Sequence, residues 1–186
     1  MKAENIQQKI EHTQQGNHTY TRRMTLGAPI VLPEEVAAIR SELGRVVATG
    51  GGYDPIHPGH ISCLRECKML GDTLIVIVNG DWFLRQKKGK PFQDLTTRSL
   101  IVSAISHVDI VVPYETSQEM GVLGAVQVIR PDVYGKGGDR SGANIRDKET
   151  YEALGIDVAT GLGEDKAWSS TWALDAWVEH AVTSRS

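Results

Sequence analysis

The sequence predicts an α/β fold: a Rossmann-like open sheet of five parallel strands with helices on both faces. Two observations carry this prediction. Strand-like and helix-like segments alternate five times after residue 45, and Thr73 to Val78 is a continuous apolar and β-branched run. Such a run is typical of a strand covered on both faces, as in a parallel sheet. Right-handed crossovers between parallel strands place helices on both sides of the sheet.

Each element has its own local signal. A helix is expected from Pro33 to about Leu43, because proline and two carboxylates suit a first helical turn. Gly71 is expected to stop the helix that follows the first strand, and Asp94 to cap the next one. The expected strands are 46–49, 73–78, 108–112, 133–134 and 156–160. The other expected helices are 58–70, 94–106, 118–129, 145–154 and 169–182, the last two capped by Asn144 and Ser169.

Length and composition indicate one domain with a short extension. Of the 186 residues, 40% are apolar and 23% are charged, which supports a packed core. Residues 1–32 are interpreted as a polar N-terminal extension and 33–186 as the domain. A net charge of −3 disfavours a nucleic-acid partner. No apolar run reaches the roughly 18–20 residues that span a bilayer, so we expect no membrane partner.

Two cysteines four residues apart, Cys63 and Cys67, form neither a disulfide framework nor a zinc pattern. They are expected to be small buried apolar residues in a reducing compartment, most simply the cytoplasm. Trp172 and Trp177 are expected to pack against the sheet or a partner chain, as is Trp168, which could instead border a ligand.

The loop after the first strand carries the strongest functional signal. Its glycines let the backbone turn tightly and approach a ligand. His57 and His60 share one face at a helix start, where unpaired N–H groups and the helix dipole favour an anion. Structural histidines are one alternative. A two-histidine metal site is another, but Asp54 is the one nearby third ligand, and no metal site is predicted.

Residues 51–60 of this loop, Gly-Gly-Tyr-Asp-Pro-Ile-His-Pro-Gly-His, resemble the Gly-x-Phe-Asp-x-x-His-x-Gly-His signature of the nucleotidyltransferase superfamily, with Tyr53 in place of Phe. The closest types are the heptose-1-phosphate adenylyltransferases and the glycerol-3-phosphate cytidylyltransferases. The resemblance implies that His57 and His60 are catalytic. It also implies nucleotide contacts for the remaining motif residues, namely Gly51, Gly52, Tyr53, Asp54 and Gly59.

Three further segments fit the same resemblance. Residues 85–91 hold four cations in what we expect to be a flexible loop, and either Lys87 or Lys88 is implied to contact phosphate. Asp81, which could equally cap a helix, and Arg98 are implied to bind substrate. Lys136, Gly138 and Asp139 resemble the heptose-type segment that lies against the nucleotide, although glycines there would also suit a plain turn. Ser169, Ser170 and Thr171 resemble the superfamily's second signature, which binds phosphates.

The predicted function is therefore transfer of a nucleoside monophosphate from a triphosphate, ATP favoured, to a phosphorylated sugar or similar acceptor, with release of pyrophosphate. Mg²⁺ is expected to arrive with the triphosphate, and a homodimer is expected from the resemblance. One alternative is a CTP-dependent cytidylyltransferase acting on a polyol phosphate, amino-alcohol phosphate or phosphonate. Another is a nucleotide-binding module without catalysis.

Overall fold

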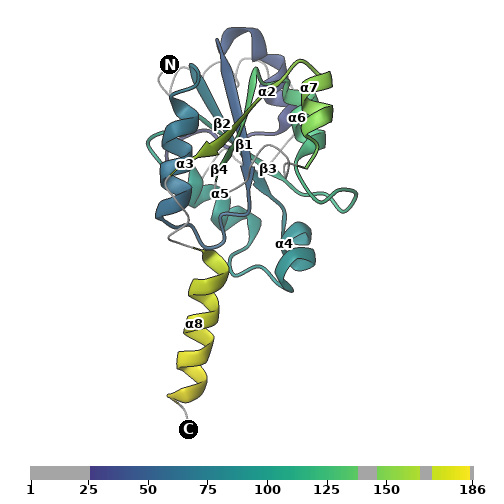
Figure 1. Ribbon diagram of the computed structural model, residues 1–186. Helices are drawn as coiled ribbons and strands as arrows, with labels where there is room; N and C mark the ends of the chain where they lie inside the picture. Colours follow the sequence, from purple (N-terminus) through teal and green to yellow (C-terminus); the bar gives the residue numbers. More distant parts are fainter. Residues whose placement is uncertain (1–25, 138–145, 164–168, 185–186) are drawn as a thin grey trace.

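The computed structural model describes residues 26–137, 146–163 and 169–184 (Figure 1). Its centre is a five-stranded sheet in the order β3-β2-β1-β4-β5, and every neighbouring pair is parallel. The strands are β1 Val46–Gly51, β2 Thr73–Asn79, β3 Ile110–Tyr114, β4 Val133–Gly137 and β5 Asp157–Leu162. The predicted fold class is confirmed.

Helices cover both faces of the sheet. They are α2 Pro33–Ala38, the 3₁₀ helix η1 Arg40–Glu42, α3 Pro58–Lys68, α4 Asp81–Lys88, α5 Leu95–Ser103, α6 Leu123–Ile129, α7 Lys148–Ala153 and α8 Ser170–Thr183. All of β2 is buried. Its alternate side chains belong to two hydrophobic cores, one on each face of the sheet. Ile75 and Ile77 pack with α2, α6 and α7, whereas Leu74 and Val76 pack with α3 and α5. Because β1 continues to β2 on one side and pairs with β4 on the other, the sheet's switch point lies at the carboxyl end of β1.

Several predicted boundaries differ from the structure. The helix expected to reach Leu43 ends at Ala38 and tightens into η1. The helices α3, α5, α6 and α7 are all shorter than expected, and Asn144 lies outside the described residues. Strands β1, β4 and β5 run further, into glycine-containing segments. A Cβ on Gly135 would lie 2.6 Å from the Cys67 sulfur, so glycine there lets α3 pack closely on β4.

The run of four cations was expected in a flexible loop, and this prediction is wrong for three of them, whereas Lys90 lies beyond the end of the helix. Arg85, Lys87 and Lys88 form the last turn of α4. The main-chain N–H groups of Asp81 and Trp82 donate to the Glu115 carboxylate, at 2.6 and 3.0 Å. The helix start is therefore capped from a distant segment, which local sequence patterns do not reveal.

The two ends of the described chain behave differently. Ala28, Ile30 and Val31 are buried, and Ile30 bridges to Val111 of β3, so this part of the expected extension packs on the domain. Helix α8, in contrast, projects away from the sheet (Figure 1) and has no buried residue. Its tryptophans therefore do not pack on the sheet, and Trp168 lies outside the described residues. Along the described residues, no helix is long and apolar enough to cross a bilayer.

Candidate active site

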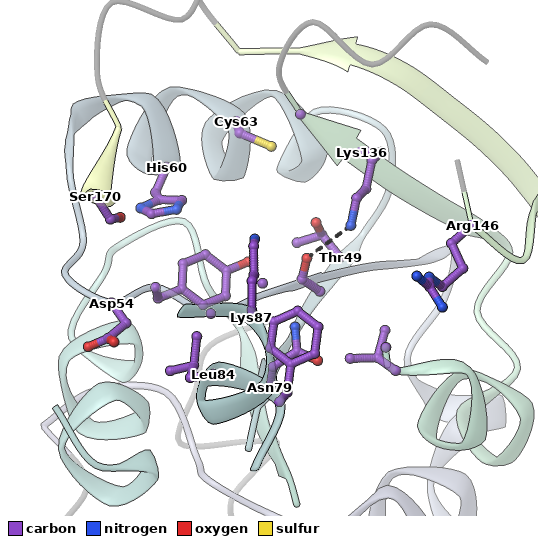
Figure 2. A pocket seen from close by; sticks show the side chains of 18 of the residues that line it. Thr49, Asp54, His60, Cys63, Asn79, Leu84, Lys87, Lys136, Arg146 and Ser170 are labelled. Carbon is purple, nitrogen blue, oxygen red and sulfur yellow. Dashed lines mark hydrogen bonds between the residues drawn. The ribbon is translucent and has the colours of Figure 1, made fainter. Parts of the chain in front are cut away.

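A cavity of about 690 Å³ opens at the carboxyl end of β1, between the starts of α3, α7 and α8, the inner face of α4 and the end of β4 (Figure 2). It brings together most of the residues implied by the sequence motifs. These are Gly51, Gly52, Tyr53, Asp54, His57, Gly59, His60, Lys87, Lys88, Lys136, Ser169, Ser170 and Thr171. Gly138 and Asp139 lie outside the described residues. Asp81 and Arg98 are not among the lining residues.

The two histidines are stacked at the start of α3. Pro58 begins the helix, so His57 is its N-cap and His60 lies in the first turn. Their ring centroids are 3.7 Å apart, with 25° between the planes. The His57 main-chain N–H donates to His60 Nδ1 at 3.3 Å. Because Nδ1 accepts this bond, the neutral His60 ring carries its proton on Nε2 and can donate it to a ligand.

Both imidazoles are neutral at pH 7. Burial, together with the smaller effects of the nearby His57, Lys87 and Lys88, lowers the pKa of His60 to about 3. Burial also lowers the pKa of His57. His57 Nδ1 is buried, and no hydrogen-bond partner for it occurs in the described part of the chain. The histidines therefore offer neutral ring groups for hydrogen bonding, while the net positive charge of the cavity comes from lysine and arginine.

Lys87 and Lys88 are neighbours on α4 but have different surroundings. Lys88 Nζ donates to the main-chain oxygen of Asp54 and lies 2.9 Å from its Oδ2. Lys87 points into the cavity (Figure 2), with its Nζ 5.6 Å from the centre of the Phe83 ring. The structure thus separates the two lysines: Lys88 is bound to Asp54, whereas the Lys87 side chain faces the cavity.

Asp54 has a structural role in the site, because its carboxylate binds other parts of the protein. Its side chain is buried, and its two carboxylate oxygens accept the main-chain N–H groups of Phe92 and Gln93, both at 2.8 Å. With Lys88 paired to the same carboxylate, the loop after β1 is joined to both ends of the α4–α5 connection. Asp54 therefore fixes the loop that carries the histidines, and its carboxylate is already occupied by protein donors.

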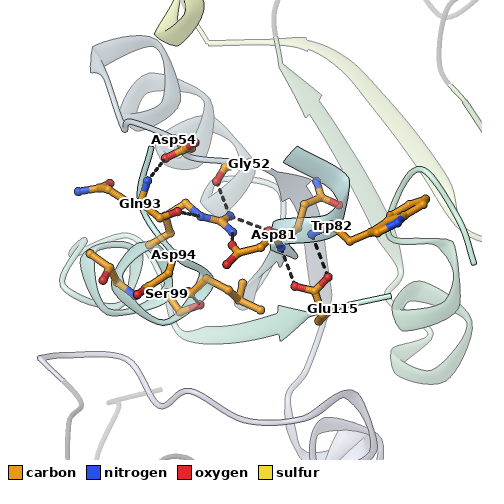
Figure 3. A network of polar contacts seen from close by, with 12 residues as sticks. Gly52, Asp54, Asp81, Trp82, Gln93, Asp94, Ser99 and Glu115 are labelled. Carbon is orange, nitrogen blue, oxygen red and sulfur yellow. Dashed lines mark hydrogen bonds and ion pairs between the residues drawn. The ribbon is translucent and has the colours of Figure 1, made fainter. Parts of the chain in front are cut away.

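Arg98 was predicted to bind substrate, but its side chain is bound by protein groups in the interior. Figure 3 shows three of the residues around it, Gly52, Asp81 and Gln93. Its side chain is fully buried. Its Nη1 donates to the main-chain oxygens of Gly52 and Asn79, at 2.8 and 2.6 Å, and its Nε to that of Gln93 at 2.9 Å. Nη2 pairs with Asp81 Oδ1 at 2.6 Å. In this geometry Arg98 and Asp81 tie together the ends of β1 and β2 and the starts of α4 and α5.

The far end of the cavity holds residues that motif reasoning missed. Arg146 and Asp147 line it just before α7, and burial raises the pKa of Asp147. Lys136, which the resemblance did imply, lies near them on β4, and its Nζ donates to the Gly50 main-chain oxygen at 3.4 Å. Asn79, at the end of β2, also lines the cavity, and its side-chain oxygen is buried with no partner among the described residues. The position of Asn79 directly after a buried strand was the available signal. Arg146 and Asp147 follow no recognisable pattern.

The cysteines only partly match the prediction. Cys67 is buried, whereas Cys63 is half-buried and lines the cavity beside α3. A hydrogen bond between the two thiols lowers the pKa of Cys63 and raises that of Cys67.

The fold and cavity define a Rossmann-like α/β protein with a cavity, lined by several cations, at the starts of two helices. Residues 48–160 match the family model described as cytidylyltransferase-like. The chain belongs to the cytidylyltransferase-like family, as the resemblance of its histidine motif implied.

Curated relatives and a solved structure agree with this assignment. The chain is 40% identical over 111 residues to the bifunctional protein HldE of Streptomyces coelicolor, covering 59% of this chain and 23% of that protein. It is 39% identical over 136 residues to HldE of Photorhabdus laumondii, covering 72% and 28%. The chain thus matches about a quarter of the length of these relatives. The crystal structure of the lipopolysaccharide core biosynthesis protein from Thermoplasma volcanium is 25% identical, with a TM-score of 0.56, covering 66% of this chain and 99% of that one.

Proposed function

We propose that the protein transfers a nucleoside monophosphate from a nucleoside triphosphate to a phosphorylated small molecule, releasing pyrophosphate. The observation that carries this proposal is the convergence, on one cavity, of the stacked His57 and His60, Lys87 of α4 and the start of α8. Neutral N–H donors, a cation and a helix start together suit a chain of phosphates.

In the proposed reaction, an oxygen of the acceptor phosphate attacks the α-phosphorus of the triphosphate. The bond from that phosphorus to the oxygen bridging to the β-phosphate breaks, and pyrophosphate leaves with the electron pair. A phosphate monoester is already nucleophilic near neutral pH, so no general base is required. The protein contributes positioning and charge stabilisation.

The residues have separate tasks in this mechanism. His60, which carries its proton on Nε2, donates to an α- or β-phosphate oxygen, and His57 hydrogen-bonds beside it. Lys87 holds the two anionic reactants together against their mutual repulsion. The main-chain N–H groups at the start of α8, near Ser170 and Thr171, bind the departing pyrophosphate.

Mg²⁺ belongs to the substrate in this proposal. Among the described residues, no group of three or more histidine, cysteine or acidic side chains is placed to hold a metal ion. The carboxylate of Asp54, in the loop after β1, already accepts two main-chain N–H groups and pairs with Lys88. The ion therefore fits as a ligand of the triphosphate oxygens, where it neutralises charge.

The acceptor is proposed to be a sugar phosphate, and the triphosphate to be ATP. The support is the similarity to HldE proteins and the resemblance of residues 136–139 to the heptose-type segment. At the far end of the cavity, Arg146 offers a cation for a phosphate. Asp147 and the Asn79 side-chain oxygen offer acceptors for hydroxyl groups.

The test is pyrophosphate release with ATP, CTP, GTP and UTP, each against a panel of phosphorylated sugars, polyols and amino alcohols. We expect turnover with ATP and a sugar phosphate, and its loss in a His57→Ala variant. Turnover with CTP and a polyol or amino-alcohol phosphate would instead identify a cytidylyltransferase. Tight nucleotide binding with no pyrophosphate release across the panel would contradict catalysis.

A further inference from the structure

Two thiols of α3 form a polar pair at the wall of the cavity, and the proposed transferase mechanism uses neither of them. Cys63 and Cys67 are one helical turn apart, and a hydrogen bond joins their side chains. Cys67 is fully buried, whereas Cys63 is half-buried and lines the cavity one turn after His60 (Figure 2). Both sulfurs lie against glycines of β4: a Cβ on Gly137 would be 2.5 Å from the Cys63 sulfur, as one on Gly135 would crowd Cys67.

We propose that Cys63 is a nucleophilic modification site, which takes up a small disulfide by thiol–disulfide exchange and thereby closes the cavity to a nucleotide. The Cys63 thiol gives its proton to solvent, and the thiolate attacks one sulfur of the disulfide. A bond forms between that sulfur and Cys63, the bond between the two reagent sulfurs breaks, and the second sulfur leaves as a thiolate with the electron pair. Cys63 is thus oxidised to a mixed disulfide, and the departing half of the reagent is reduced to a thiol.

The surroundings of Cys63 favour the thiolate, which is the form that attacks a disulfide. The hydrogen bond from Cys67 and the nearby Lys136 lower the pKa of the Cys63 thiol, against the opposing effects of burial and of Glu66. Cys67 is also hydrogen-bonded to the Thr49 side chain, which holds it in place as a partner of Cys63. A polar chain of hydroxyl and thiol groups therefore ends at the one sulfur of the pair that lines the cavity.

A bond between Cys63 and Cys67 themselves is not the expected product. Side chains four residues apart on a helix have Cβ atoms about 5–6 Å apart, whereas a disulfide needs about 3.5–4.5 Å. Both cysteines lie within α3, so closing this bond would distort the helix that carries the histidines. A mixed disulfide leaves the helix intact, because its second half extends into the cavity of about 690 Å³.

The charges of the cavity favour an anionic disulfide, for which glutathione disulfide is the probe. Lys87, Lys136 and Arg146 line the cavity. Of the two carboxylates among the described lining residues, that of Asp54 is already paired with a lysine, which leaves Asp147. The group added to Cys63 would occupy the space that the proposed function gives to the triphosphate, so the closure rests on the proposed function, whereas the reactivity of the thiol does not.

The first test is the intact mass of the full chain after incubation with glutathione disulfide at pH 7, with peptide mapping of the product. The wild type should gain one glutathionyl group at Cys63, and Cys63→Ser should gain none. Cys67→Ala removes the hydrogen-bond donor and should slow the reaction at least about threefold. Cys67→Ser keeps a donor and is the matched control, which should retain most of the rate. Circular dichroism checks that each variant is folded.

The second test compares glutathione disulfide with the cationic disulfide cystamine. Each rate is divided by the rate of the same reagent with N-acetylcysteine, so that only the effect of the protein remains. The anionic reagent should be favoured about tenfold or more at low salt, and Lys136→Gln should reduce this preference. A preference for cystamine would contradict the role given to the cations.

The third test is the binding of a fluorescent ATP analogue before and after the modification. The reduced protein should bind it, the glutathionylated protein should not, and dithiothreitol should restore binding. The proposal is overturned by an unmodified Cys63, by a Cys63–Cys67 disulfide as the product, by a Cys67→Ala variant that reacts at the wild-type rate, or by nucleotide binding that survives the modification. Uptake of glutathione at Cys63 by a protein that binds nucleotide in neither form would contradict the proposed function and the closure, but not the reactive thiol.

Discussion

Replacing Lys88 by alanine should destabilise the protein, whereas replacing Lys87 by alanine should slow the reaction without affecting stability. The two residues are adjacent on α4 and carry the same charge, so each is the other's matched control. Lys88 Nζ lies 2.9 Å from Asp54 Oδ2, and the two side chains are 16% and 1% exposed. Lys87 instead points into the cavity.

The expected size of the stability loss follows from the partners that Asp54 keeps. Removing one member of a buried ion pair costs about 3–5 kcal/mol when the other charge is left without compensation. Here the Asp54 carboxylate still accepts two main-chain N–H bonds at 2.8 Å, which stabilise its charged form. We therefore expect Lys88→Ala to lower the free energy of unfolding by about 2 kcal/mol. In a chain of this length, that lowers Tm by roughly 4–8 °C.

Two assays separate the effects. Urea unfolding and thermal melts measure stability, and pyrophosphate release at saturating triphosphate measures kcat. Lys87→Ala should keep the wild-type Tm while kcat falls about 10²–10³-fold, as for other donors of transition-state stabilisation. A Lys88→Ala variant with unchanged Tm and lost turnover, beside a Lys87→Ala variant that turns over normally, would refute the assignment of the two lysines.

Three further predictions follow from the same site. His57→Ala should lower kcat about 10²–10³-fold with Tm unchanged, measured by pyrophosphate release beside a thermal melt, and near-normal turnover would contradict its role. The folded pKa of His60, about 3, lies below the unfolded value of about 6.5, so the unfolded chain binds more protons between these values and stability falls as the pH falls through this window. Urea unfolding should show a loss of up to about 2 kcal/mol from this group between pH 7 and pH 5, and His60→Gln should remove that part of the slope. Arg98→Met should cost about 3–5 kcal/mol in urea unfolding, because it leaves the buried oxygens of Gly52 and Asn79 and the Asp81 carboxylate without their donor, and Arg98→Lys should restore only part of this since lysine lacks the planar fork.

Local sequence patterns were sufficient wherever an element depends on its own residues. The run of apolar residues in β2 forms a strand buried along its whole length. Asp94 and Ser169 cap their helices through their own side chains, as predicted. The histidine motif marks the turn after β1 because glycine, proline and the two histidines act within one short segment.

Patterns failed where the cause lies far away in the chain. Helix α4 was missed because its N-terminal cap is the side chain of Glu115, the residue that follows β3. Arg98 was interpreted as a ligand contact because its charge is visible in the sequence, whereas its acceptors come from three separate segments, at residues 52, 79–81 and 93. The choice between Lys87 and Lys88 depends on which of them faces Asp54, and only the packing of α4 decides that.

In this site the ion pairs of Asp54 and Asp81 hold the surrounding loops in place, while Lys87, Lys136 and Arg146 line the cavity. Two carboxylates that sequence reasoning placed in the site, Asp54 and Asp81, are paired inward with Lys88 and Arg98. Each pairing removes a negative charge that would repel a phosphate and fixes a loop end that carries a site residue. The histidines stay neutral because burial lowers their pKa, and an arriving polyphosphate would raise it again by placing negative charge beside them. Binding of the triphosphate should therefore be accompanied by proton uptake at mildly acidic pH. Calorimetric titration in buffers of different ionisation enthalpy would measure it, and the His60→Gln variant should show less.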